Sequence, residues 1–276
     1  METFHQSLYR KWISVATLIG FFYASFVRWP FLPWLNFWFS KKGALYRENE
    51  APRISVRAHS YISKIIDSHM AFTCIAERQY EPDGYAIQNG DVVVDIGAHI
   101  GSFALLAHAR EARVIACEPS PENYRVLSQN IMHNNAHNIT ALQICVAGKD
   151  GVRELFLDGQ NAARNGLYGA GHSISVPALS LATLFKLQNI TQCDFLKVDC
   201  EGAEYEIIEM IPLEMFARIN KIAMEYHLPP YFGLNTQTHK LSRIIKKLKQ
   251  IGFEVRIVPE NKLRGLLFAH RPTVAV

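Results

Sequence analysis

Acidic residues stand at the ends of three strands that the sequence predicts. Asp95 follows the valine run 92–94, Glu118 follows Arg113–Cys117, and Asp199 ends the run Asp194–Asp199. Because the carboxyl ends of parallel strands meet at one edge of a sheet, we expect these side chains to lie near one another. Carboxylates at such an edge can hydrogen-bond ligand hydroxyls, accept protons or bind a cation.

A glycine turn follows the first of these strands. Three consecutive valines at 92–94 are typical of a central parallel strand, and Gly97 and Gly101 precede a helix-compatible stretch at 103–107. Glycine lets a cofactor approach the backbone N–H groups of such a turn. Glu118 lies about twenty residues further on, the spacing at which a carboxylate can bind a ribose. The Gly-x-x-x-Gly spacing favours a nucleoside cofactor without a pyrophosphate over NAD.

Three sequence blocks, in this order, resemble the FkbM-type family of S-adenosylmethionine-dependent class I methyltransferases. They are Val94-Asp-Ile-Gly-Ala-His-Ile-Gly101, Glu118-Pro-Ser-Pro-Glu-Asn123 and Leu196-Lys-Val-Asp-Cys-Glu-Gly-Ala-Glu204. The similarity covers roughly residues 85–227. One departure is visible, because Leu181-Ala-Thr-Leu184 stands where the family commonly has Leu-Asp-Asp-Leu. Loop closure or substrate choice is therefore expected to differ.

The resemblance implies a role for each matching residue. The first block would surround the methionine part of S-adenosyl-L-methionine, and Glu118 would hold its ribose. Asn123 and Val146 would flank the ribose and adenine, while Asp199 and Glu201 would face the reactive side. The predicted cofactor-binding set is Asp95, Gly97, Ala98, His99, Gly101, Glu118, Asn123, Val146 and Asp199.

The predicted catalytic set is Asp199, Glu201, Glu225 and His227, from the ends of two neighbouring strands. His227 is the general-base candidate because its ordinary pKa is near neutral, although a histidine held by structural hydrogen bonds is an equal alternative. No metal is favoured. A divalent cation on Asp199, Glu201 and Glu225 is the alternative, since hard oxygen ligands suit magnesium.

Strand-like and helix-like segments alternate from Val92 onward and predict an α/β fold. It is a doubly wound, mostly parallel seven-stranded sheet of the Rossmann-like kind. Strands are predicted at 92–95, 113–117, 139–146, 194–199, 221–226, 253–258 and 265–270, with shorter β candidates at 152–157 and 173–176. Helices are predicted at 121–134, 179–187, 203–210 and 236–251. The last two strands are expected to pair as an antiparallel hairpin at the sheet's edge.

The chain divides into an apolar, aromatic-rich N-terminal arm at 1–40, an approach segment at 41–90 and a methyltransferase domain at 91–276. All four tryptophans lie in the arm. Its uninterrupted apolar part is shorter than the roughly 20 residues that span a bilayer, and no cleavage site follows it. Peripheral membrane contact through residues 12–39 and packing against the enzyme or a partner subunit remain the two interpretations.

The net charge of +4 comes from dispersed basic residues, so no nucleic-acid partner is expected. The five cysteines form no ligand or disulfide pattern, which indicates reduced thiols and a cytoplasmic location. The oligomeric state is not indicated.

The sequence thus predicts an enzyme, an S-adenosylmethionine-dependent methyltransferase. Its acceptor is expected to be a small molecule, glycan or lipid, with the methyl going to a hydroxyl of a sugar, glycolipid or other secondary metabolite. Two alternatives are an NAD-dependent oxidoreductase and a non-catalytic, membrane-recruited binding module on the same fold.

Overall fold

The computed structural model describes residues 52–56, 61–158, 164–229 and 233–272. The predicted arm at 1–40 lies outside these residues, so its contact with a membrane or with the enzyme stays a prediction. Within the described ranges no helix is both long enough and apolar enough to cross a bilayer.

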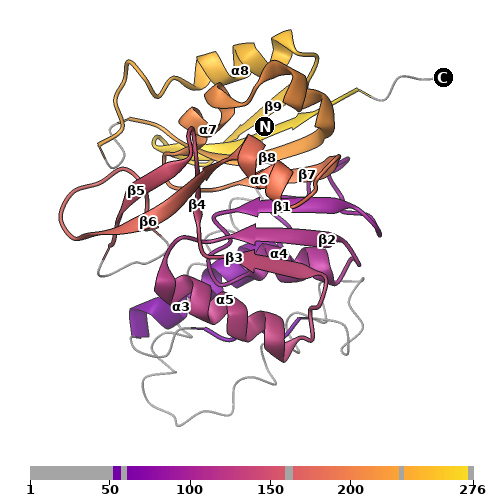
Figure 1. Cartoon of the computed structure of the whole chain (residues 1–276), viewed down its shortest axis with the longest axis vertical. Helices are drawn as coiled ribbons and strands as arrows, with labels where there is room; N and C mark the ends of the chain where they lie inside the picture. Colours follow the sequence, from indigo (N-terminus) through magenta and orange to yellow (C-terminus); the bar gives the residue numbers. More distant parts are fainter. Residues whose placement is uncertain (1–51, 57–60, 159–163, 230–232, 273–276) are drawn as a thin grey trace, which may run out of the picture. The chain divides into compact units, whose positions relative to one another are not determined.

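A seven-stranded sheet forms the centre of the fold (Figure 1). Its order is β3-β2-β1-β7-β8-β10-β9, with strands at β1 Val92–Ile96, β2 Arg113–Cys117, β3 Ile139–Leu142, β7 Cys193–Val198, β8 Ile219–His227, β9 Glu254–Pro259 and β10 Arg264–His270. The first five strands in this order are parallel, and β10 runs antiparallel to both β8 and β9. The predicted mostly parallel α/β sheet is therefore confirmed. Of the last two strands, β10 lies inside the sheet and β9 at the edge.

Helices pack around this sheet. The helices α3 and α4 and the π-helix η1 contact one another near β1 and β2, while α7 packs against α8. Their bounds are α3 Tyr61–Ala71, η1 Phe72–Ala76, α4 Ser102–His108, α5 Pro121–His133, α6 Leu181–Leu187, α7 Glu204–Met210, η3 Leu213–Arg218 and α8 Leu241–Gln250. The proline at the start of α5 suits a position whose N–H has no helical partner.

One predicted strand was wrong. The apolar run 139–146 contains no glycine or proline, so it reads as a single strand, but it forms β3 and then β4, Cys145–Ala147. Strand β4 belongs to a second sheet, in the order β4-β6-β5, with β5 Gly151–Phe156 and β6 Ser173–Ser180. The chain therefore leaves the main sheet after Leu142.

The predicted helix at 236–251 begins later than expected, at Leu241. The side chain of Asn235 accepts a hydrogen bond from Gln237 N at 2.6 Å, and the ring of His239 accepts one from Asn235 N at 2.9 Å. Such local side-chain bonds hold the backbone in a turn and compete with the helix.

The point where the strand order reverses lies between β1 and β7. From β1 the chain moves outward through β2 and β3, and then returns to the other side of β1 as β7. Val94 of β1 and Leu196 of β7 are fully buried neighbours. Asp199 N donates to Ile96 O at 3.0 Å and joins the two strand ends. Ligands bind at such reversal points in open α/β sheets.

Candidate active site

A cleft of about 440 Å³ opens at this reversal point. The volume falls within the range of small-molecule and cofactor sites. Among the predicted residues, those that line it are Gly97, His99, Glu118, Asn123, Val146, Asp199, Glu201 and Glu225. Eight predicted residues from different strand ends are thus brought to one cavity.

Glu118 is held rigidly at one end of the cleft. Its carboxylate accepts hydrogen bonds from His99 N at 2.8 Å, Ser120 N at 2.9 Å and the Asn123 side-chain amide at 3.3 Å. Burial raises the pKa of Glu118, and the hydrogen bonds from Ser120, His99 and Asn123 oppose that shift. This fixed carboxylate can accept hydrogen bonds from a diol such as a ribose.

The glycine turn has a steric cause that the sequence did not reveal. Gly97 has φ +76°, and a Cβ atom on it would lie 1.7 Å from the carbonyl oxygen of Asp199. A Cβ on Gly101 would lie 2.6 Å from Leu127 Cδ1. Both glycines therefore allow close packing of the protein on itself, and Gly97 also lines the cleft.

Three of the predicted cofactor residues, Asp95, Ala98 and Gly101, do not line this cleft. Asp95 is fully buried, with its Oδ1 atom 3.0 Å from Lys197 Nζ. Burial raises the pKa of Asp95, although Lys197 opposes the shift. Asp95 is thus linked to the turn through Lys197, whose ammonium also donates to Gly97 O, and a direct contact with the cofactor stays a prediction.

Lys197 was part of a quoted motif, but no role was predicted for it. Its ammonium donates to Gly97 O at 2.9 Å and lies 3.0 Å from Asp95 Oδ1 and 3.6 Å from Asp199 Oδ2. Burial disfavours the charge, but the two carboxylates outweigh it and raise the pKa of Lys197 above its ordinary value. A lysine within the mostly apolar central strand β7 was the available signal, because such a charge needs a buried partner.

Tyr80 also belongs to the site, and no pattern in the sequence indicates it. Its hydroxyl donates to Asp199 Oδ2 at 2.8 Å, across 119 residues of chain. Burial acts to raise the pKa of Asp199, but Lys197, His227 and the Tyr80 hydrogen bond together lower it. Asp199 is therefore a carboxylate near neutral pH.

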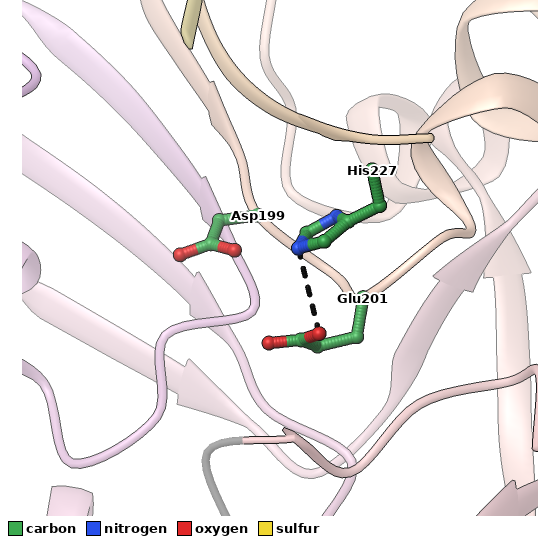
Figure 2. Close-up of side chains that lie close together, drawn as sticks. All are labelled: Asp199, Glu201 and His227. Carbon is green, nitrogen blue, oxygen red and sulfur yellow. Dashed lines mark ion pairs between the residues drawn. The ribbon is translucent and has the colours of Figure 1, made fainter. Parts of the chain in front are cut away.

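The other end of the cleft holds the predicted catalytic residues. Figure 2 shows Asp199, Glu201 and His227 with their side chains directed toward one another. His227 Nε2 lies 3.4 Å from Glu201 Oε2 and also 3.4 Å from Glu225 Oε1. Glu225 is bound by Arg264 at 2.7 Å. The structure thus brings together all four predicted residues, although His227 itself is fully buried behind the cleft wall.

Glu204 fixes His227 from behind. Its Oε1 atom lies 2.8 Å from His227 Nδ1 and accepts the backbone N–H of His227 at 2.9 Å. Its other oxygen accepts Gly202 N at 2.7 Å. Both Glu204 and His227 are fully buried. In the sequence Glu204 was only the last residue of a motif, and its pairing with His227 depends on the packing of α7 against β8, which no local pattern encodes.

The electrostatics do not favour His227 as a general base. Burial disfavours its charged form, but Glu204, Glu225 and Glu201 outweigh that effect and raise the pKa of His227 well above its ordinary value. An imidazole that is already protonated near neutral pH cannot accept a further proton. The sequence prediction used only the ordinary pKa of histidine and could not include these carboxylates.

The helix that departs from the family pattern is α6. Ser180 caps it by accepting a hydrogen bond from Thr183 N, and the Thr183 hydroxyl donates to Asp150 Oδ2 at 2.7 Å. Neither Ala182 nor Thr183 lines the cleft. An effect of this departure on substrate choice stays a prediction.

The chain is similar in sequence to known methyltransferases. The family model described as methyltransferase FkbM domain matches residues 95–255. The chain is 27% identical over 241 residues to methyltransferase sdnD of Sordaria araneosa, covering 75% of this chain and 88% of that one. It is also 27% identical over 186 residues to 31-O-demethyl-FK506 methyltransferase FkbM of Streptomyces tacrolimicus, covering 55% and 71%. A solved human methyltransferase 10 domain containing protein aligns with a TM-score of 0.46 and 12% identity, covering 84% and 94%.

The seven-stranded, mostly parallel Rossmann-like sheet is the fold of class I methyltransferases, and the cleft lies at its reversal point. The family match covers more than half of the chain, and the chain belongs to the FkbM methyltransferase family. It is an S-adenosylmethionine-dependent methyltransferase. The NAD-dependent alternative is not favoured.

Proposed function

We propose that the protein transfers a methyl group from S-adenosyl-L-methionine to a hydroxyl of a small molecule such as a sugar, glycolipid or other secondary metabolite. The observation that carries this proposal is the single cleft joining Glu118 at one end to Asp199, Glu201 and Glu225 at the other. One end offers a fixed acceptor for ribose hydroxyls. The other end offers several carboxylates for a polar acceptor molecule.

In this proposal the cofactor lies across the glycine turn. Glu118 accepts hydrogen bonds from the ribose, Asn123 and Val146 flank the ribose and adenine, and Gly97 and His99 line the methionine end. The methyl then points toward Asp199 and Glu201. The name of the Streptomyces relative states that it acts on an O-demethyl compound, which supports oxygen as the acceptor atom.

The reaction is an in-line displacement, so positioning the acceptor is the main task of the protein. A lone pair of the hydroxyl oxygen forms the new C–O bond to the methyl carbon. The C–S bond breaks and its electron pair stays on sulfur, which gives neutral S-adenosylhomocysteine. The hydroxyl proton is released to water. Asp199 and Glu201 support this step by accepting a hydrogen bond from the hydroxyl and holding its oxygen toward the methyl.

Cofactor binding is tested by titration calorimetry with S-adenosylhomocysteine on the full chain and on Glu118→Gln. Hydrogen bonds to a charged group are worth about 1.5–3 kcal/mol, so we expect the variant to bind roughly 10- to 100-fold more weakly. Glu214→Gln is the control, because Glu214 is exposed in η3 and does not line the cleft. Equal affinity of Glu118→Gln and the wild type would remove Glu118 from the cofactor site.

The acceptor is tested by incubating the protein with trideuteromethyl-labelled cofactor and a panel of glycans, glycolipids and hydroxylated metabolites. Mass spectrometry then locates the added group. We expect the label on oxygen. The controls are compounds that offer an amine nitrogen or a carbanion as the acceptor. A label found only on nitrogen or carbon of these controls would refute O-methylation, but the protein would still be a methyltransferase.

A further inference from the structure

We propose that Asp199, Glu201 and His227 form a binding site for a divalent first-row transition-metal cation at the acceptor end of the cleft. This inference deepens the proposed function. The role of the ion in methyl transfer rests on the proposed function, whereas the binding of the ion does not. It differs from the sequence-based alternative, in which Glu225 was the third ligand.

The three side chains have the geometry that a cation needs. One potential ligand atom from each lies within 4.8 Å of the other two. Metal–ligand distances of about 2.0–2.2 Å place neighbouring ligand atoms about 3 Å apart and opposite ones about 4.3 Å apart. The observed 3.4 Å between His227 Nε2 and Glu201 Oε2 falls between these values. Small side-chain rotations therefore suffice to close the site (Figure 2).

The surrounding residues orient the ligands as metal sites require. Glu204 accepts from His227 Nδ1 at 2.8 Å, which directs the other ring nitrogen toward Asp199 and Glu201. A cation binds at this nitrogen by displacing the Nε2 proton of the imidazolium, so binding releases one proton to water. A carboxylate behind a ligating histidine is the usual way to fix the ring and its tautomer. Glu204 is itself held by two backbone N–H groups, from Gly202 and His227. Asp199 is held by two side chains, because the Tyr80 hydroxyl donates to its Oδ2 atom and the Lys197 ammonium lies 3.6 Å from the same atom.

Glu225 is less suited to be a ligand, although it is near. Its Oε1 atom is bound by Arg264 at 2.7 Å, so coordination would require this ion pair to break. Glu201, by contrast, belongs to the set of three side chains whose ligand atoms all lie within 4.8 Å of one another. Its side chain is 13% exposed and lines the cleft. These contacts favour Glu201 over Glu225.

The donor set indicates the kind of ion. Two carboxylate oxygens and one imidazole nitrogen suit Mn²⁺, Fe²⁺ or Zn²⁺ better than Ca²⁺, which takes six to eight oxygen ligands. Three protein ligands leave positions open toward the cleft, where an acceptor hydroxyl could bind. A cation there would lower the pKa of the hydroxyl, so its proton could leave to water before the C–O bond forms.

The test is Mn²⁺ binding to the full chain after treatment with a chelator, measured by electron paramagnetic resonance and calorimetry. We expect one Mn²⁺ per chain. Glu201→Gln should weaken binding at least 10-fold, while the exposed control Glu214→Gln should not change it. Glu204→Gln is a second variant, because Glu204 orients His227. Loss of one orienting carboxylate typically weakens a metal site by about 10- to 100-fold, and we expect an effect of that size on Mn²⁺ binding. Circular dichroism checks that each variant is folded.

Absence of saturable Mn²⁺ binding at millimolar concentration would overturn the inference, as would Glu201→Gln binding that equals the wild type. Calorimetry with S-adenosylhomocysteine on the same samples separates the two proposals. Cofactor binding without Mn²⁺ binding refutes only the metal site. Mn²⁺ binding that Glu201→Gln weakens, without cofactor binding, supports the metal site and refutes the proposed placement of the cofactor.

Discussion

Replacing Lys197 with methionine should destabilise the protein strongly, because its ammonium stands between two carboxylates. It lies 3.0 Å from Asp95 Oδ1 and 3.6 Å from Asp199 Oδ2. At an effective dielectric constant of about 20 each attraction is worth roughly 5 kcal/mol before desolvation is subtracted. Desolvation cancels much of this sum, and measured costs of breaking a buried pair are about 3–5 kcal/mol. We expect a loss of that size.

The loss should come mainly from Asp95, which is fully buried and would be left as an unpaired charge, whereas the Asp199 side chain is 11% exposed. Chemical denaturation measures the free energy of unfolding. A loss of 3–5 kcal/mol would also lower Tm by roughly 6–20 °C in a domain of this size. Lys186→Met is the control, since Lys186 is exposed on α6, and it should change stability by less than about 0.5 kcal/mol.

A double-mutant cycle separates the charge from the packing. Adding Asp95→Asn to Lys197→Met removes the uncompensated carboxylate, so we expect the double variant to recover at least about 2 kcal/mol relative to Lys197→Met. If the two single effects add, or if Lys197→Met costs less than about 1 kcal/mol, the ammonium does not neutralise Asp95 and the reasoning fails.

Two further predictions follow from the glycine turn and from the thiols. Gly97→Ala should cost clearly more stability than Gly84→Ala, because both glycines have positive φ but only a Cβ at 97 would meet a backbone oxygen; equal losses in thermal denaturation would show that the backbone angle alone matters. All five cysteines are free, and burial raises the pKa of Cys145 to about 11, so at pH 8 only about one in a thousand Cys145 thiols is ionised. Disulfide-exchange reagents should therefore titrate five thiols rapidly in denaturant and slowly in the native protein, and rapid native reaction of Cys145 would contradict its burial.

The sequence predicted the parts of the site that depend on local pattern. Glu118 and Asp199 each follow an apolar run, so the strands that end there could be read directly, and the parallel order then placed both acids at one edge. The absence of any ligand spacing indicated cysteines that are mostly buried, and four of the five are buried in the structure.

The remaining features depend on tertiary contacts that no local pattern encodes. Tyr80 reaches Asp199 from a segment 119 residues away. The protonation of His227 depends on three carboxylates that packing places around it. The predicted third strand is split because β4 pairs with β6, whereas β3 pairs with β2 in the main sheet. Both segments are hydrophobic, so hydrophobicity alone does not indicate that they belong to different sheets.

The position of Tyr80 bears on how far the enzyme can be shortened. The family match starts at residue 95, yet Ile66, His69 and Met70 line the cleft and Tyr80 binds Asp199. A fragment beginning at Asp91 would keep every family motif but lose one wall of its ligand cavity and a hydrogen-bond donor to Asp199. A domain boundary drawn from the family match would thus cut through the candidate site, and grafting this activity onto another scaffold requires the chain from α3 onward.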